Sequence, residues 1–156
     1  MAGKPRERSA ARLAAVQALY QMDIVQTPLP NILAEFESHW IDKPVEGEKY
    51  QRAEAAFFRD IVTGVVREQR GLDPKIDGVL AAGWPLKRVE AILRAVLRAG
   101  GYELCHRADV PARVVISEYV DVAAAFLDRE ETGMVNAVLD KLAREARTAE
   151  FQASKE

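Results

Sequence analysis

Apolar side chains recur at the three- and four-residue spacing of amphipathic helices along most of the chain. No stretch alternates apolar and polar residues as a half-buried strand would, and no internal repeat is evident. The pattern therefore predicts an all-α protein of about seven helices. They are a first helix from Pro5 or Ser9 to a point before Thr27, helices over residues 30–40, 49–70, 74–82 and 86–106, and two helices within 110–145.

The clearest part of the pattern is a helical hairpin over Val110–Glu145. Pro111 fits the first helical position, and the charged turn Asp128–Glu131 separates the two helices. Each helix carries one apolar stripe, formed by Val115, Tyr119, Val122 and Phe126 and by Val135, Val138, Leu139 and Leu142. Two such helices joined by a short turn lie antiparallel and bury their facing stripes.

The middle of the chain carries two further local signals. The sequence Leu72-Asp73-Pro74 predicts a helix break, with Asp73 as the cap and Pro74 as the first residue of the next helix. Gly100 and Gly101 lie inside a predicted helix, where each costs roughly 1 kcal/mol relative to alanine, and a close helix–helix contact is the favoured explanation. The core side of these helices is expected to include Ile32, Leu33, Phe36, Trp40, Val89, Leu93, Val96, Leu97 and Leu104.

The first helix combines an apolar face with arginines at its border. At 100° per residue, one face gathers Leu13, Val16, Leu19, Tyr20 and Ile24. Arg12 projects at one border of that face with Arg8 just beyond it, and Gln17 flanks the other border. One interpretation is that Arg12 lays its stem on apolar surface and keeps its head in water. The other is that Arg8, Arg12 and the amino end of the helix face phosphates. Spacing alone favours the first.

Composition limits the choice of function. A chain of 156 residues with 49% hydrophobic content suits one compact domain. The net charge of −2 gives no global sign of nucleic-acid binding, but residues 1–22 carry a local balance of +3, so an anionic partner is expected at the amino end. A single cysteine, Cys105, fits a reducing cytoplasm, and neither a secretory signal nor an apolar run of membrane-spanning length is present.

No group of residues predicts catalysis, and we expect no metal and no cofactor. His39 and His106 lie far apart and lack the neighbouring ligands of a zinc site. Cys105 and His106 are adjacent in a helix and point about 100° apart, which is a poor arrangement for a nucleophile and its base. Gly100-Gly101 is not followed by the lysine of a phosphate-binding loop. The sequence favours a non-enzymatic role.

The hairpin also carries a resemblance to a known family. The order DVP, VVISEYVDVAAAF and MVNAVLDKLARE resembles the carboxyl-terminal half of the NusB family of transcription antitermination factors, and AVQALY at Ala15–Tyr20 repeats that family's first-helix motif. The resemblance implies two packed three-helix subdomains plus an additional helix. We accordingly expect a single domain over 1–156, with helical halves at about 1–70 and 71–147 and a frayed tail at 148–156.

The resemblance further implies binding to single-stranded boxA-type RNA of nascent ribosomal transcripts, and it reverses the preference for Arg12 in favour of an RNA contact. The candidate RNA-binding residues are Arg6, Arg8, Arg12, Gln17, Tyr20, Met134 and Asn136. Met134 replaces a family phenylalanine that stacks on RNA, and Val79 aligns with a tyrosine of some members, so weaker stacking is expected. The alternative to RNA binding for Tyr20 is burial in the core. For Asn136 it is a buried amide that connects two helices.

The family also pairs with NusE, a ribosomal protein of the small subunit, and thereby with RNA polymerase and other Nus factors. The candidate NusE contacts are Glu90, Arg94, Arg113 and Glu118. Many relatives have an acidic residue where this chain has Leu93, which suggests a rearranged partner surface. Two other hypotheses remain open. One is a protein-binding helical adaptor or homodimer without RNA contact, and the other is a detached RNA-binding module of an RNA cytosine methyltransferase.

Overall fold

The computed structural model describes residues 5–41, 48–80 and 85–153, with side chains for 8–38, 54–80, 85–87 and 89–151. Within these ranges the chain forms seven α-helices, one short 3-10 helix and no strand, which confirms the all-α prediction. The elements are α1 (Pro5–Val25), α2 (Leu29–Ile41), α3 (Glu48–Val79), η1 (Leu86–Arg88), α4 (Ala91–His106), α5 (Ala112–Phe126), α6 (Arg129–Ala146) and α7 (Thr148–Ala153).

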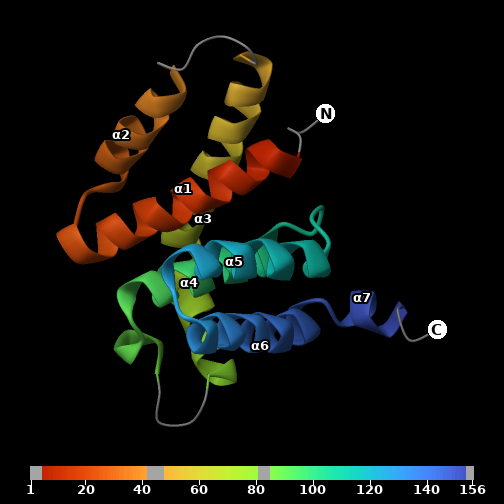
Figure 1. Cartoon of the computed structure of the whole chain (residues 1–156). Helices are drawn as coiled ribbons and strands as arrows, with labels where there is room; N and C mark the ends of the chain where they lie inside the picture. The colour runs from red at the N-terminus through yellow and green to blue at the C-terminus, as the bar shows by residue number, and fades with distance from the viewer. Residues whose placement is uncertain (1–4, 42–47, 81–84, 154–156) are drawn as a thin grey trace.

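Helices α3 and α4 form the centre of the molecule. α1 packs on both of them, α2 packs on α3 and α1, and the α5–α6 hairpin packs on α4. Figure 1 shows α2 and the first part of α3 above α1, whereas α5 and α6 lie below it. The arrangement gives two packed three-helix groups, α1–α3 and α4–α6, with α7 as an additional helix. α1 contacts α4 and α5, and α3 contacts α4 and α6, so the two groups meet along both α1 and α3.

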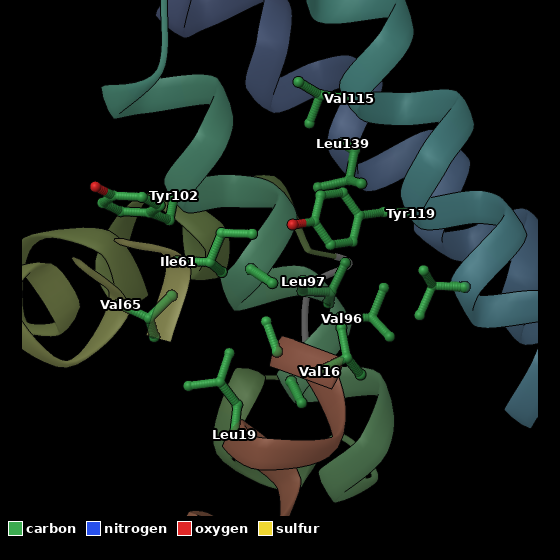
Figure 2. Packing of buried hydrophobic residues seen from close by; sticks show 14 of the residues in the cluster. Val16, Leu19, Ile61, Val65, Val96, Leu97, Tyr102, Val115, Tyr119 and Leu139 are labelled. Carbon is green, nitrogen blue, oxygen red and sulfur yellow. The ribbon is translucent and has the colours of Figure 1, made fainter. Parts of the chain in front are cut away.

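The hairpin stripes pack as predicted, with one exception. Val115, Tyr119 and Leu139 are fully buried in the core cluster. Figure 2 shows Tyr119 and Leu139 on one side of Val96 and Leu97 of α4, and Val16 and Leu19 of α1 on the other. The exception is Phe126, which is 41% exposed because it is the last residue of α5 and lies at the edge of the hairpin.

The predicted break at residues 72–74 is wrong. α3 runs without interruption through Pro74, and the carboxylate of Asp73 accepts hydrogen bonds from Arg98 instead of capping a helix. An internal proline costs about 3 kcal/mol. Leu72 and Ile76 are both buried on either side of it, and burying each is worth about 2 kcal/mol, so packing offsets the cost. The predicted helix end at residue 82 lies outside the described residues.

The glycine pair of α4 is explained by close packing, as predicted. A Cβ atom on Gly100 would lie 2.9 Å from Leu139 Cδ1, and a Cβ atom on Gly101 would lie 3.2 Å from Leu72 Cδ1. α4 therefore approaches side chains of α6 and α3 so closely that a Cβ atom at either position would require those leucines to move. The predicted helix over 86–106 is divided, however, into η1 and α4.

The prediction of a frayed tail is wrong for residues 148–153, which form α7. Glu150 Oε1 accepts a hydrogen bond of 2.8 Å from the backbone N–H of Ala112 at the start of α5. The Arg147 guanidinium donates to four backbone carbonyls at and beyond the end of α4, those of Glu103, Leu104, Arg107 and Val110. Helix ends leave such groups without intrahelical partners, so the tail is fixed by satisfying them.

Candidate nucleic-acid interface

The rotation of α1 about its own axis differs from the prediction. Its buried residues are Ala11, Arg12, Ala15, Val16, Ala18 and Leu19. Of the predicted apolar face, only Val16 and Leu19 are inside, whereas Leu13, Tyr20 and Ile24 are 36%, 38% and 56% exposed. At 100° per residue, the centres of the predicted and observed faces differ by about 110°. Hydrophobic periodicity alone therefore does not account for how α1 packs.

Arg12 lies on the observed buried face of α1. Its side chain is 2% exposed, and its Nε and Nη2 atoms lie 2.8 and 3.0 Å from the two carboxylate oxygens of Glu103 on α4. Its Nη1 atom lies 2.9 Å from Glu118 Oε1 on α5. Both interpretations from the sequence are wrong about its location, because the guanidinium faces neither water nor an open phosphate-binding surface.

Two hydroxyl groups complete this buried cluster. The Tyr119 hydroxyl donates to Glu103 Oε2, and the Ser9 hydroxyl donates to Glu118 Oε1 at 2.7 Å. Burial alone would lower the pKa of Arg12, but the hydrogen bonds and charge of Glu103 more than compensate, so the pKa is raised and the guanidinium stays charged. Burial, followed by the Glu103 charge, raises the pKa of Tyr119 well above its ordinary value. We call Arg12, Glu103, Glu118, Tyr119 and Ser9 the ionic cluster; it joins α1, α4 and α5.

Arg8 lies beside this cluster and is only partly covered. Its side chain is 19% exposed, and its guanidinium is 4.5 Å from the centre of the Phe57 ring and 4.0 Å from the Asp109 carboxylate. The guanidinium groups of Arg12 and Arg107 each lie 4.9 Å from the same ring. Burial and then repulsion by Arg107 lower the pKa of Arg8. Arg8 thus retains some access to solvent, unlike Arg12, and the Arg6 side chain lies outside the described side chains.

The opposite side of α1 presents an exposed row of residues. Leu13, Gln17, Tyr20 and Ile24 follow one another at intervals of four, three and four residues, and all four are exposed. We call this row the outer stripe. Core burial of Tyr20 is therefore excluded. The outer stripe offers one aromatic ring and one amide, the two kinds of group that stack on RNA bases and hydrogen-bond their edges.

The remaining RNA candidates lie on α6. Asn136 is exposed, so the interpretation as a buried amide is wrong. Met134 is half-buried and packs against the core cluster. α4 and α5 each pack on both α1 and α6, so these residues belong to a different part of the surface from the outer stripe. Val79 is buried and presents nothing to a ligand.

The candidate partner contacts divide into two kinds. Glu90 and Arg113 are exposed. Glu118 belongs to the ionic cluster, and the Arg94 side chain also forms its hydrogen bonds within the protein. Its guanidinium lies 2.8 Å from the Asp23 carboxylate and donates to the carbonyls of Leu86, Lys87 and Val89.

Leu93 is fully buried. The expectation that it alters a partner surface is therefore wrong, because its side chain packs in the core.

Glu103, the buried partner of Arg12, is not among the residues predicted from the sequence. It follows Val96 and Gly100 at intervals of four and three residues, so it lies on the buried face of α4. A carboxylate at such a position needs a buried cation, and that requirement was the available signal.

The described side chains contain no group of three or more histidine, cysteine or acidic residues that could hold a metal ion. His106 stacks on Tyr102, with ring centres 5.3 Å apart, and burial raises the pKa of the half-buried Cys105 thiol. Among the described helices, none is long and apolar enough to span a bilayer.

The two three-helix groups, packed together through α1 and α3 on one side and α4, α5 and α6 on the other, define a NusB-type helical bundle. The chain belongs to the NusB family, whose family model matches residues 9–144. It is 70% identical to a transcription antitermination protein NusB of Bradyrhizobium diazoefficiens over 95% of this chain and 90% of that protein. It is 68% identical to the protein of the same name from Nitrobacter hamburgensis, over 95% and 92% of the two chains.

Solved structures show the same fold. NusB of T. maritima superposes with a TM-score of 0.78 at 28% identity, covering 93% of this chain and 96% of that one. A second neighbour is an antitermination factor NusB solved with NusE and double-stranded RNA. It has a TM-score of 0.72 at 25% identity, with 90% and 98% of the two chains covered.

Proposed function

We propose that this protein is an RNA-binding antitermination factor that binds boxA-type RNA in nascent ribosomal transcripts together with NusE and supports processive transcription. The observation that carries the proposal is the 70% identity, over 95% of the chain, to a transcription antitermination protein. The neighbour solved with NusE and RNA supports the choice of partners. The role is one of binding, in the cytoplasm where transcription occurs, and requires neither catalysis nor a cofactor.

The RNA surface in this proposal is the outer stripe of α1. Tyr20 stacks on a base, and Gln17 hydrogen-bonds a base edge, since both side chains are exposed on the same side of the helix. Arg6 and the partly exposed Arg8 supply positive charge at the amino end, and Asn136 with half-buried Met134 forms a second RNA contact on α6, apart from the outer stripe. Arg12 is not a direct RNA contact in this proposal, because its hydrogen-bond donors bind Glu103 and Glu118.

The NusE surface in this proposal includes Glu90, which is exposed just before α4, and Arg113, which is exposed in the first turn of α5. Arg94 and Glu118 support that surface from within: Arg94 holds η1 against the start of α4, and Glu118 holds α5 against α1. Replacing either of the exposed residues is expected to weaken partner binding without a change in folding.

Salt-titrated fluorescence anisotropy with a boxA-type RNA, with and without NusE, tests the proposal. Tyr20→Ala is expected to weaken RNA binding roughly 5- to 100-fold, the value of one stacked base, and leave the melting temperature unchanged. The matched control is Val66→Ala, on the exposed surface of α3, which is expected to bind as the wild type does.

The adaptor hypothesis predicts a different outcome. If NusE binding gains nothing from the RNA, and a scrambled RNA of equal length binds as well as the boxA-type one, the proposed function is wrong. A salt-dependent preference for boxA that increases with NusE supports it.

A further inference from the structure

We propose that Arg12 is a positioning residue for RNA binding: its ion pairs with Glu103 and Glu118 hold α1 at the rotation that exposes Gln17 and Tyr20. The inference rests on the proposed function for the identity of the ligand. It concerns, however, how this chain builds the binding surface, and its first step can be tested without RNA.

The packing of α1 requires an explanation because it leaves larger apolar side chains outside. The helix exposes Leu13, Tyr20 and Ile24, while half of its buried residues are alanines, which contribute little apolar area. A turn of about 110° would bring the predicted apolar face inward. Some other interaction must therefore favour the observed rotation. The ionic cluster joins α1 to both α4 and α5 through hydrogen bonds of the buried Arg12 side chain.

The geometry of Arg12 is suited to fixing a rotation. Its guanidinium is planar, and two of its donors meet both oxygens of Glu103 while a third meets Glu118 on a different helix. Bidentate binding constrains the plane of the group, and a third contact on another element constrains its direction. Gln17 lies about 140° and Tyr20 about 80° around the helix from Arg12. With Arg12 held inward, both side chains point away from α4 and α5.

A single replacement of Arg12 does not separate positioning from folding. Glu103 is fully buried, so Arg12→Met leaves an uncompensated charge in the core and is expected to lower the melting temperature by roughly 6–20 °C. The double variant Arg12→Met/Glu103→Gln removes the ion pair and leaves no buried charge. The glutamine amide oxygen still accepts from the Tyr119 hydroxyl, and Glu118 keeps the Ser9 hydroxyl as its donor.

The first measurement is the reactivity of the Tyr20 ring toward tetranitromethane, followed by peptide mass mapping on the wild type and the double variant. We expect the double variant to melt within a few degrees of the wild type. Its Tyr20 reactivity should fall severalfold, because α1 turns its apolar face inward. The buried ring of Tyr102, which lies outside the ionic cluster, serves as the internal control. Unchanged Tyr20 reactivity in the folded double variant overturns the inference whether or not the protein binds RNA.

The second measurement is RNA affinity as a function of salt. The double variant is expected to bind at least about tenfold more weakly, with the same slope of log Kd against log salt as the wild type. A slope reduced by about 0.7 means instead that Arg12 contacts a phosphate directly. Wild-type affinity in the double variant means that the ion pair does not set the RNA surface. Either of these results overturns the inference, whereas a wild type that ignores boxA-type RNA overturns the proposed function itself.

Discussion

Two sides of α4 are fastened to their neighbours by different kinds of interaction. Toward α6, Gly100 lets the helix backbone approach the buried, apolar side chain of Leu139. Toward α1, Glu103 binds the buried guanidinium of Arg12. The apolar side follows from the spacing of hydrophobic residues in the sequence. The ionic side does not, because the pairing of two charges from distant helices leaves no periodic signal.

The two sides are also expected to differ in how they tolerate change. At an apolar contact, the loss of stability grows with the volume that a substitution removes. A second substitution that neutralises a charge cannot compensate for it. A buried ion pair loses much stability when one partner is removed and can regain it when both become neutral. The contrast therefore makes a distinct prediction for each side.

The largest expected effect in this comparison is that of Leu139→Ala on the apolar side. The variant leaves a cavity against Gly100, and we expect the free energy of unfolding to fall by about 3 kcal/mol, equally at low and high salt. Urea denaturation at two salt concentrations measures this, with the volume-conserving Leu139→Met as the control. A loss below about 1 kcal/mol would mean that α4 and α6 close the cavity, and the contact would then be less rigid than Gly100 suggests.

The same contrast explains what could be predicted from the sequence. The stripes of Val115 and Tyr119 and of Val135 and Leu139 were predicted correctly because apolar side chains at helical spacing have one way to be buried. The face of α1 was predicted wrongly because Arg12 was counted as a border residue. A charged side chain is buried in the core only when a side chain of opposite charge, here Glu103, is buried beside it. That pairing depends on the tertiary structure.

Local signals failed where tertiary contacts overrode them. Pro74 is a strong helix breaker in isolation, yet Leu72 and Ile76 on either side of it are buried, and α3 continues. The tail lacks an apolar stripe, yet Arg147 and Glu150 fix it by satisfying backbone groups of α4 and α5. In both cases the residues that stabilise the segment come from parts of the chain distant in sequence.

An effect of intermediate size is expected at the carboxyl-terminal tail, where the charged side chain of Arg147 binds backbone carbonyls instead of another charged side chain. Arg147→Ala removes hydrogen bonds to four carbonyls at the end of α4, and we expect a loss of about 2 kcal/mol in the free energy of unfolding. Lys141→Ala, on the exposed surface of α6, is the control and is expected to change stability by less than about 0.5 kcal/mol. Equal stability of the two variants would mean that water replaces the guanidinium at these carbonyls without cost.

The smallest expected effect concerns an ion pair at the surface, beside the ionic cluster. Hydrogen bonds from Arg107 lower the pKa of Asp109 from 3.8 to about 2. The folded protein therefore binds this proton less tightly than the unfolded chain does. The pair stabilises the fold above about pH 4, and this stabilisation is lost as the pH falls from 4 to 2.

Asp109→Asn tests this contribution. The side chain is 55% exposed, so solvent screening limits the pair to at most about 1 kcal/mol. Urea denaturation from pH 2 to pH 7 should show wild type and variant converging at the acid end and differing slightly at neutral pH. High salt should reduce the difference, because exposed charges are screened. A difference at pH 2 as large as that at pH 7 would instead mean that the asparagine disturbs the turn between α4 and α5, since most of the charge contribution is already lost there.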